Sequence, residues 1–253
     1  MADPLFSIAR FTLVEARHAR IGLLTVLNIL VWLLLANLLS ALAITDSQHI
    51  FIGTFATGMR LGSVVLIALF VATGSVRELS DGGCHFLLSR PLSRTRYYCG
   101  KLLACLIIAM LIAMLTIAAL WPFAGLRAAT FYGVGMGCEL IVVAGFALAA
   151  TTAIGQAPAA VLASAAFYLL TRSIGAIVLM SESALALDQG SIGAQLARVL
   201  AWLLPDLAEF SSTSTLWLHD AQWSTLGVVG LQTIVYLAVL SGIGLFDLQR
   251  KSL

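Results

Sequence analysis

The sequence predicts an all-α membrane protein, and three observations support this prediction. Of the 253 residues, 60% are hydrophobic and 10% are charged, whereas soluble domains are about 25% charged. The apolar residues form runs of about 20 residues or more, which is the length that a helix needs to cross a hydrocarbon core. No alternating strand pattern interrupts these runs. We therefore expect one transmembrane domain over residues 1–253, with six spanning helices.

The N-terminal segment, residues 3–19, is too short and too charged to cross a membrane. Leu5, Ala9, Leu13 and Ala16 recur at helical spacing, so they share one apolar face. Charged residues occupy the other faces of the same helix. This pattern predicts an interfacial elbow helix that lies on the inner leaflet.

The apolar runs predict where the spans lie. The first, residues 21–44, contains no charged residue and is long enough, at about 1.5 Å per residue, to cross a core of roughly 30 Å. The other five are expected at residues 55–76, 102–123, 131–152, 157–180 and 223–246. The fourth and fifth are separated at residues 155–158, because proline removes a backbone hydrogen-bond donor.

The placement of Lys and Arg predicts the orientation, because these residues collect at the cytoplasmic ends of spans. All but four of the 14 fall on the side that holds both termini of an even-numbered bundle, and the exceptions are Arg60, Arg127, Arg172 and Arg198. We therefore expect both termini and residues 77–101 in the cytoplasm, and residues 181–222 on the outer side. The expected location is a bacterial inner membrane.

The cytoplasmic loop at residues 77–101 has an order of residues that lipid alone does not require. Two carboxylates precede a Gly-Gly turn, an apolar triplet follows, and a proline ends any helix before a basic stretch. The residues that carry this pattern are Glu78, Gly82, Phe86, Leu87, Leu88, Arg90, Pro91, Arg94, Gly100 and Lys101. The basic residues alone would also be explained as anchors on the inner side. The whole ordered set is typical of a short helix that lies against another protein.

This order resembles the loop between the second and third spans of type-2 ABC exporter permeases, which reads Glu, Gly-Thr, Leu-Leu, Pro, Arg and then Gly-Lys. Here Gly83 stands where the family usually has Thr. A Leu-Pro-Asp-Leu…Phe stretch at residues 204–210 extends the resemblance. The resemblance implies a permease that dimerises, as a homodimer or alternatively a heterodimer. It also implies that this dimer binds two copies of a separate cytoplasmic ATPase. The loop would form the coupling helix through which movements of the ATPase reach the spans.

Two other classes of function are alternatives to an exporter. A permease-like subunit of an assembly or maturation complex, for example in metal or cofactor processing, would share the same loop. An intramembrane enzyme needs a nucleophile with a base, paired aspartates or metal ligands inside the bundle, and no such set occurs in the spans. We therefore expect no catalytic residue and no metal site. Cys105, Met110 and Met114 are explained by packing rather than by copper binding.

No Walker motif of the form Gly-x-x-x-x-Gly-Lys-Ser/Thr occurs in the sequence. ATP and Mg are therefore expected in the partner ATPase, and this chain is expected to hold no cofactor and to be no enzyme. Its expected partners are the ATPase, a second permease copy and membrane lipid, but no nucleic acid. No pattern in the spans identifies the substrate.

Three ionisable residues, Arg60, Glu139 and Arg172, fall in the outer halves of predicted spans. A charge in a span is costly unless it is paired or hydrated. One interpretation is structural: Glu139 pairs with an arginine and holds two helices together, or the arginines extend to the surface. The other is functional: these side chains face an outer cavity and meet a polar or anionic substrate.

Overall fold

The computed structural model describes residues 4–44, 46–80, 94–185, 204–213, 216 and 223–250. Within these ranges every regular element is a helix, and no strand occurs in them. Six of the helices are long and apolar enough to cross a membrane. The prediction of an all-helical, multi-pass membrane protein with six candidate spans is confirmed.

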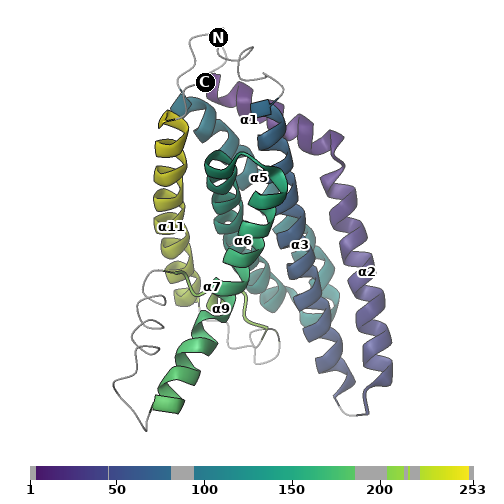
Figure 1. Ribbon diagram of the computed structural model, residues 1–253. Coiled ribbons are helices and arrows are strands. Elements are labelled where there is room, and N and C mark those ends of the chain that lie inside the picture. Colours follow the sequence, from purple (N-terminus) through teal and green to yellow (C-terminus); the bar gives the residue numbers. More distant parts are fainter. Residues whose placement is uncertain are drawn as a thin grey trace.

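Except for the first, which ends at Leu42 rather than at residue 44, the helices that hold the candidate spans extend beyond the expected bounds. In chain order they are α1 (Pro4–His18), α2 (Ile21–Leu42), α3 (Ser47–Ser80), α5 (Arg94–Ala124), α6 (Leu126–Ile154), α7 (Ala157–Leu185), α9 (Leu207–Phe210) and α11 (Trp223–Arg250). The 34 residues of α3 correspond to a length of roughly 51 Å, which exceeds the hydrocarbon core at both ends. Helix α1 lies at the same end of the bundle as the last turns of α3 and α11 and the first turn of α5 (Figure 1).

Backbone geometry explains the junction between α6 and α7. Gly155 has φ of 74° and donates its N–H to the Thr151 carbonyl at 3.0 Å, so it forms the C-cap of α6. Glycine adopts this left-handed conformation without steric cost. Pro158 follows in the first turn of α7, where its missing N–H has no helical partner to lose. Between α1 and α2 the turn is made by Arg20, a non-glycine residue with φ of 54°.

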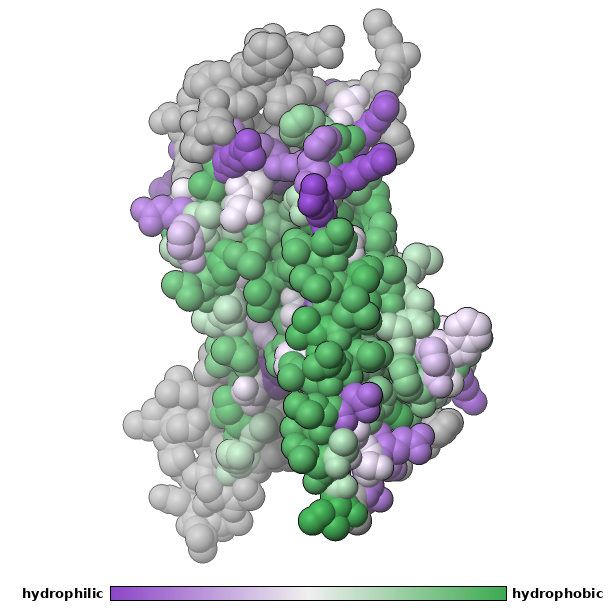
Figure 2. All heavy atoms as spheres, turned by 90° about the vertical axis from the view of Figure 1, so that its right-hand side faces the viewer, coloured by the Kyte–Doolittle hydropathy of each residue, from purple (hydrophilic) through white to green (hydrophobic). Residues whose placement is uncertain are grey.

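The outer surface of the bundle is apolar over its middle. On the face that carries α2, hydrophobic residues form a broad band, and hydrophilic residues gather mainly toward the two ends (Figure 2). Leu23, Leu30 and Leu34 of α2 expose more than half of their side chains, at 60%, 56% and 66%. Such a belt is stable in lipid and not in water, because contiguous apolar surface of this extent is rare on soluble monomers.

Two glycines of α3 allow α2 to approach closely. A Cβ at Gly58 would lie 2.0 Å from the Trp32 ring, and a Cβ at Gly62 would lie 1.9 Å from Oδ1 of Asn28. The Asn28 side chain also donates to the Met59 carbonyl at 3.1 Å. Small residues spaced by four and an interhelical hydrogen bond are the contacts that hold helices together in membranes.

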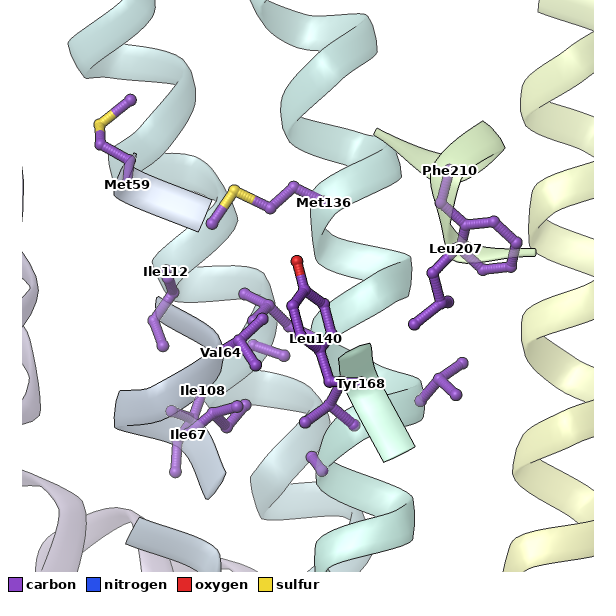
Figure 3. Close-up of a cluster of buried hydrophobic side chains, with 14 of the residues drawn as sticks. Met59, Val64, Ile67, Ile108, Ile112, Met136, Leu140, Tyr168, Leu207 and Phe210 are labelled. Carbon is purple, nitrogen blue, oxygen red and sulfur yellow. The ribbon is translucent and has the colours of Figure 1, made fainter. Parts of the chain in front are cut away.

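Helix α6 is the centre of the core. It packs against α3, α5, α7, α9 and α11, and Glu139, Leu140 and Val143 on it are fully buried. Figure 3 shows the apolar side chains that meet around it: Met59, Val64 and Ile67 from α3, Ile108 and Ile112 from α5, Met136 and Leu140 from α6, Tyr168 from α7, and Leu207 and Phe210 from α9. The short helix α9 therefore forms part of the same core as four of the candidate spans.

Candidate functional site

The structure brings together the three charged residues that the sequence singled out within spans. Arg60 of α3, Glu139 of α6 and Arg172 of α7 surround Ser211, which directly follows α9. We call these four residues the outer polar cluster. Glu139 is 0% exposed and Arg60 is 5% exposed, so both charges depend on partners within the protein rather than on water.

Glu139 has two direct partners in the outer polar cluster. Its Oε1 atom lies 3.7 Å from Nη1 of Arg172, and its Oε2 atom accepts a hydrogen bond from the Ser211 hydroxyl. The same hydroxyl accepts from Arg60 at 3.3 Å and from Arg172 at 3.2 Å. Ser211 thus links one anion to two cations, and the cluster carries a net positive charge.

Both arginines also donate to backbone carbonyls of α9 and of the residue that follows it. Arg60 Nη1 donates to the Ser211 carbonyl at 2.8 Å. Arg172 Nη1 donates to the Leu207 carbonyl at 2.6 Å, and its Nη2 donates to the Ser211 carbonyl at 3.3 Å. Carbonyls at a helix C-terminus have no intrahelical partner and carry partial negative charge. Because α9 has only four residues, the carbonyl of its first residue, Leu207, and that of Ser211 after its last residue both accept from the arginines.

Close contacts with two helices position α9. A Cβ at Gly135 of α6 would lie 1.8 Å from the Phe210 carbonyl oxygen, and a Cβ at Gly175 of α7 would lie 2.6 Å from Oδ2 of Asp206. Asp206 also caps α9, since its Oδ1 accepts from the Ala208 N–H at 2.9 Å. Both glycines are needed because any larger residue would occupy the space of this segment.

This geometry favours the structural interpretation of the three charges. Glu139 is paired with an arginine, and the cluster joins α3, α6 and α7 to the segment after α9. The arginine side chains bind within the protein, and the Arg172 side chain retains 21% exposure. Arg172 is therefore the most exposed of the three charged members of the cluster. Ser211 was not singled out from the sequence, although it directly follows the Leu-Pro-Asp-Leu…Phe stretch.

A second group of polar residues lies at the opposite end of α3. Glu78 of α3 forms an ion pair with Lys101 of α5, with 2.7 Å between Oε2 and Nζ, and also accepts a hydrogen bond from the Tyr97 hydroxyl. Lys101 is only 2% exposed and Glu78 is 13% exposed. Glu15 of α1 lies near Glu78, and the two carboxyl groups interact. We call Glu15, Glu78, Tyr97 and Lys101 the inner polar cluster.

Glu15 is held against α3 by another close contact, since a Cβ at Gly74 would lie 3.3 Å from Oε1 of Glu15. Gly74 precedes Glu78 by one helical turn, so the Glu15 carboxyl lies beside that of Glu78. Burial raises the pKa of the Glu15 carboxyl above its ordinary value of 4.5; the Lys101 ammonium opposes this effect and the Glu78 carboxylate adds to it. Glu15 was not predicted as a site residue from the sequence, because a single acidic residue is common in a charged interfacial helix.

The predicted coupling residues are described only at the two ends of the loop. Glu78 and Lys101 stand on either side of it and are joined by their ion pair, and Arg94 is the first residue of α5. Gly82, Phe86, Leu87, Leu88, Arg90 and Pro91 lie outside the described residues. The coupling helix itself therefore stays a prediction.

The structure separates the sulfur-containing residues of α5. Cys105 is 1% exposed, whereas Met110 and Met114 are 54% and 72% exposed. Cys105 lies in the core, whereas Met110 and Met114 lie on the exposed side of α5. Packing rather than copper binding stays a prediction for all three. No group of three or more His, Cys, Asp or Glu residues in the described part of the chain is placed to hold a metal ion.

No family model matches the chain, and none of the curated proteins matches it. The exporter family inferred from the cytoplasmic loop therefore stays a prediction from the sequence.

Proposed function

We propose that this chain is the permease subunit of an ATP-driven ABC exporter in a bacterial inner membrane. In this proposal two copies form a dimer, both termini face the cytoplasm, and each copy binds a separate ATPase through the loop between α3 and α5. ATP and Mg bind the ATPase and not this chain. The ATPase would drive the movement of a solute across this membrane.

The observation that supports this proposal best is the connection between the two ends of the loop. Glu78 and Lys101 are the first and last charged members of the ordered set from which the family was inferred, and they form a buried ion pair at 2.7 Å. A force on the loop therefore acts on α3 and α5 together rather than on one helix end. Such a connection is what a coupling loop requires.

Helix α3 provides a direct path from the loop to the outer side. It carries Glu78 in the inner polar cluster and Arg60 in the outer polar cluster. These residues are separated by roughly 27 Å along a continuous helix at 1.5 Å per residue. A displacement of α3 at its inner end would move Arg60 relative to the carbonyls of α9. Helix α3 would thus link the ATPase on the cytoplasmic side to α9 and Ser211 on the outer side.

The test is copurification of the ATPase with loop variants. An apolar anchor of a few residues typically carries most of an interface's binding energy, so Leu87→Asp should abolish association. Arg94→Ala should weaken association modestly, and more so at low salt, because surface charges are then least screened. The thermal stability of each permease variant without the ATPase is the control.

Two results would contradict the proposal. The first is that Leu87→Asp keeps its ATPase. The second is that this variant loses the ATPase only because the permease itself unfolds at the temperature of the assay. ATPase activity that responds to a further protein subunit but to no solute would instead indicate an assembly or maturation complex.

A further inference from the structure

The inner polar cluster contains more acid than base. Glu15 and Glu78 contribute two carboxyl groups, and Lys101 contributes one ammonium group that is 2% exposed and points at Glu78. With all three ionised, the cluster would carry a net negative charge in a largely buried position. Two carboxylates that share a site rarely both ionise, because each disfavours the charge of its neighbour.

The hydrogen-bond donors around the two carboxyl groups are unevenly shared. Oε2 of Glu78 accepts from Tyr97 and faces Lys101. Oε2 of Glu15 and Oε1 of Glu78 are buried and have no hydrogen-bond partner among the residues that the structure describes. Ionised carboxylates only accept hydrogen bonds. Nζ of Lys101 is also buried without a hydrogen-bond partner among the described residues, so a proton shared by the two carboxyl groups would add a donor to the one that the ammonium supplies.

The other ionisable neighbours of Glu15 among the described residues lie on α3, on α5 and on α1 itself. From α3, Arg77 acts on Glu15 as the weakest of the opposing influences and is itself exposed. From α5, the neighbours are Tyr97, Lys101 and the buried thiol of Cys105. On α1 itself the other ionisable side chains, Arg10, Arg17 and His18, are exposed.

We propose that Glu15 and Glu78 form a proton-binding site, in which one carboxylic acid is hydrogen-bonded to one carboxylate beside the ammonium of Lys101. The proton is placed on Glu15, because Glu78 already accepts a hydrogen bond from Tyr97 and forms the ion pair with Lys101. With one proton bound, the two carboxyl groups and the ammonium sum to zero charge. The site lies on the residues that join α1 to α3 and α5, and it requires neither an ATPase nor a particular solute.

The proton links the attachment of α1 to pH. The folded-state pKa of Glu15 is raised above its ordinary value of 4.5 by burial. A raised acid pKa means that stability is fully present below pH 4.5 and declines as the pH rises through the folded-state value. Release of the proton leaves two carboxylates that repel each other across the contact between α1 and α3.

The deciding experiment uses the full-length chain in lipid nanodiscs. As the pH falls from 8 to 5, a protonated carboxyl stretch should appear in the infrared spectra of the wild type and of Glu209→Gln at a higher pH than in the spectrum of Glu15→Gln. Glu209 is a suitable control because it is an exposed residue on α9. The melting temperature of the wild type should rise as the pH falls from 8 to 5, and that of Glu15→Gln should not.

The same variants separate a proton site from an ordinary ion pair. Glutamine mimics the neutral acid, so Glu15→Gln should be at least as stable as the wild type at pH 8. If Glu15 were simply a second anion for Lys101, this variant would be less stable at pH 8 or too unstable to purify, and the proposal would be overturned. Absence of the carboxyl stretch from the wild type would overturn it independently of any variant.

Discussion

The two polar clusters at the ends of α3 have opposite compositions. The outer polar cluster has two arginines and one glutamate, whereas the inner polar cluster has two glutamates and one lysine. Arginine does not release its proton inside a protein, so the extra positive charge needs permanent acceptors. The carbonyls of Leu207 and Ser211 provide them. A carboxyl group can instead take up a proton, so the extra acid needs no permanent donor.

This difference indicates that the two ends of the bundle respond differently to their surroundings. The outer polar cluster binds backbone atoms, neither of its arginines can change its charge, and its one carboxyl group, Glu139, is paired with Arg172. We therefore expect the attachment of α9 to change little between pH 5 and 8. The inner polar cluster joins three helices through side chains alone, and one of these side chains can change its charge. The following variants test that contrast, from the largest expected effect to the smallest.

Glu139→Gln should have the largest effect, because it leaves the buried Arg60 and the partly buried Arg172 without an anion. Removing one partner of a buried ion pair costs about 3 to 5 kcal/mol, and Glu139 is 0% exposed. The measurement is denaturant unfolding of the purified protein in bicelles at pH 5 and pH 8, and the loss should be the same at both. Glu209→Gln, on the exposed side of α9, is the control. Equal stability of the two variants would show that Glu139 does not hold this region together.

Lys101→Met should have a smaller effect that depends on pH. At pH 8 the variant leaves Glu78 without its cation, and the cost should be up to about 3 kcal/mol, at the low end for a broken buried pair. At pH 5 the loss should shrink, because the raised pKa of Glu15 lets this carboxyl group bind a proton and so lowers the negative charge of the cluster. A loss that is equal at pH 5 and pH 8 would mean that the inner polar cluster is as fixed as the outer one.

The sequence predicted the spans far better than it predicted the contacts between them. Apolar runs are a local signal, so six candidate spans were found from composition and length. Arg60, Glu139 and Arg172 were found because a charge within an apolar run is conspicuous. Their common partner was not, since Ser211 is a small polar residue that lies 151 positions from Arg60 along the chain.

The inner polar cluster was only half predicted, for a related reason. Glu78 and Lys101 belong to an ordered loop pattern, but the pattern does not state that they are partners. Glu15 and Tyr97 lie among other polar residues near helix ends, where nothing local distinguishes a buried side chain from an exposed one. Only the packing of α1 against α3 and α5, which depends on residues far apart in the sequence, identifies them.

The smallest predicted effect comes from a matched pair, Tyr97→Phe and Tyr132→Phe, each of which removes one hydroxyl. Tyr132 donates to the Ala56 carbonyl at 2.8 Å, whereas Tyr97 donates to the Glu78 carboxylate. Each loss should cost about 1 kcal/mol, as is typical of one hydrogen bond. Only Tyr97→Phe should also shift the pH profile of stability. Its hydroxyl favours ionised Glu78, so without it the carboxyl pair should bind its proton more tightly and release it at higher pH. Identical pH profiles for the two variants would place the proton elsewhere.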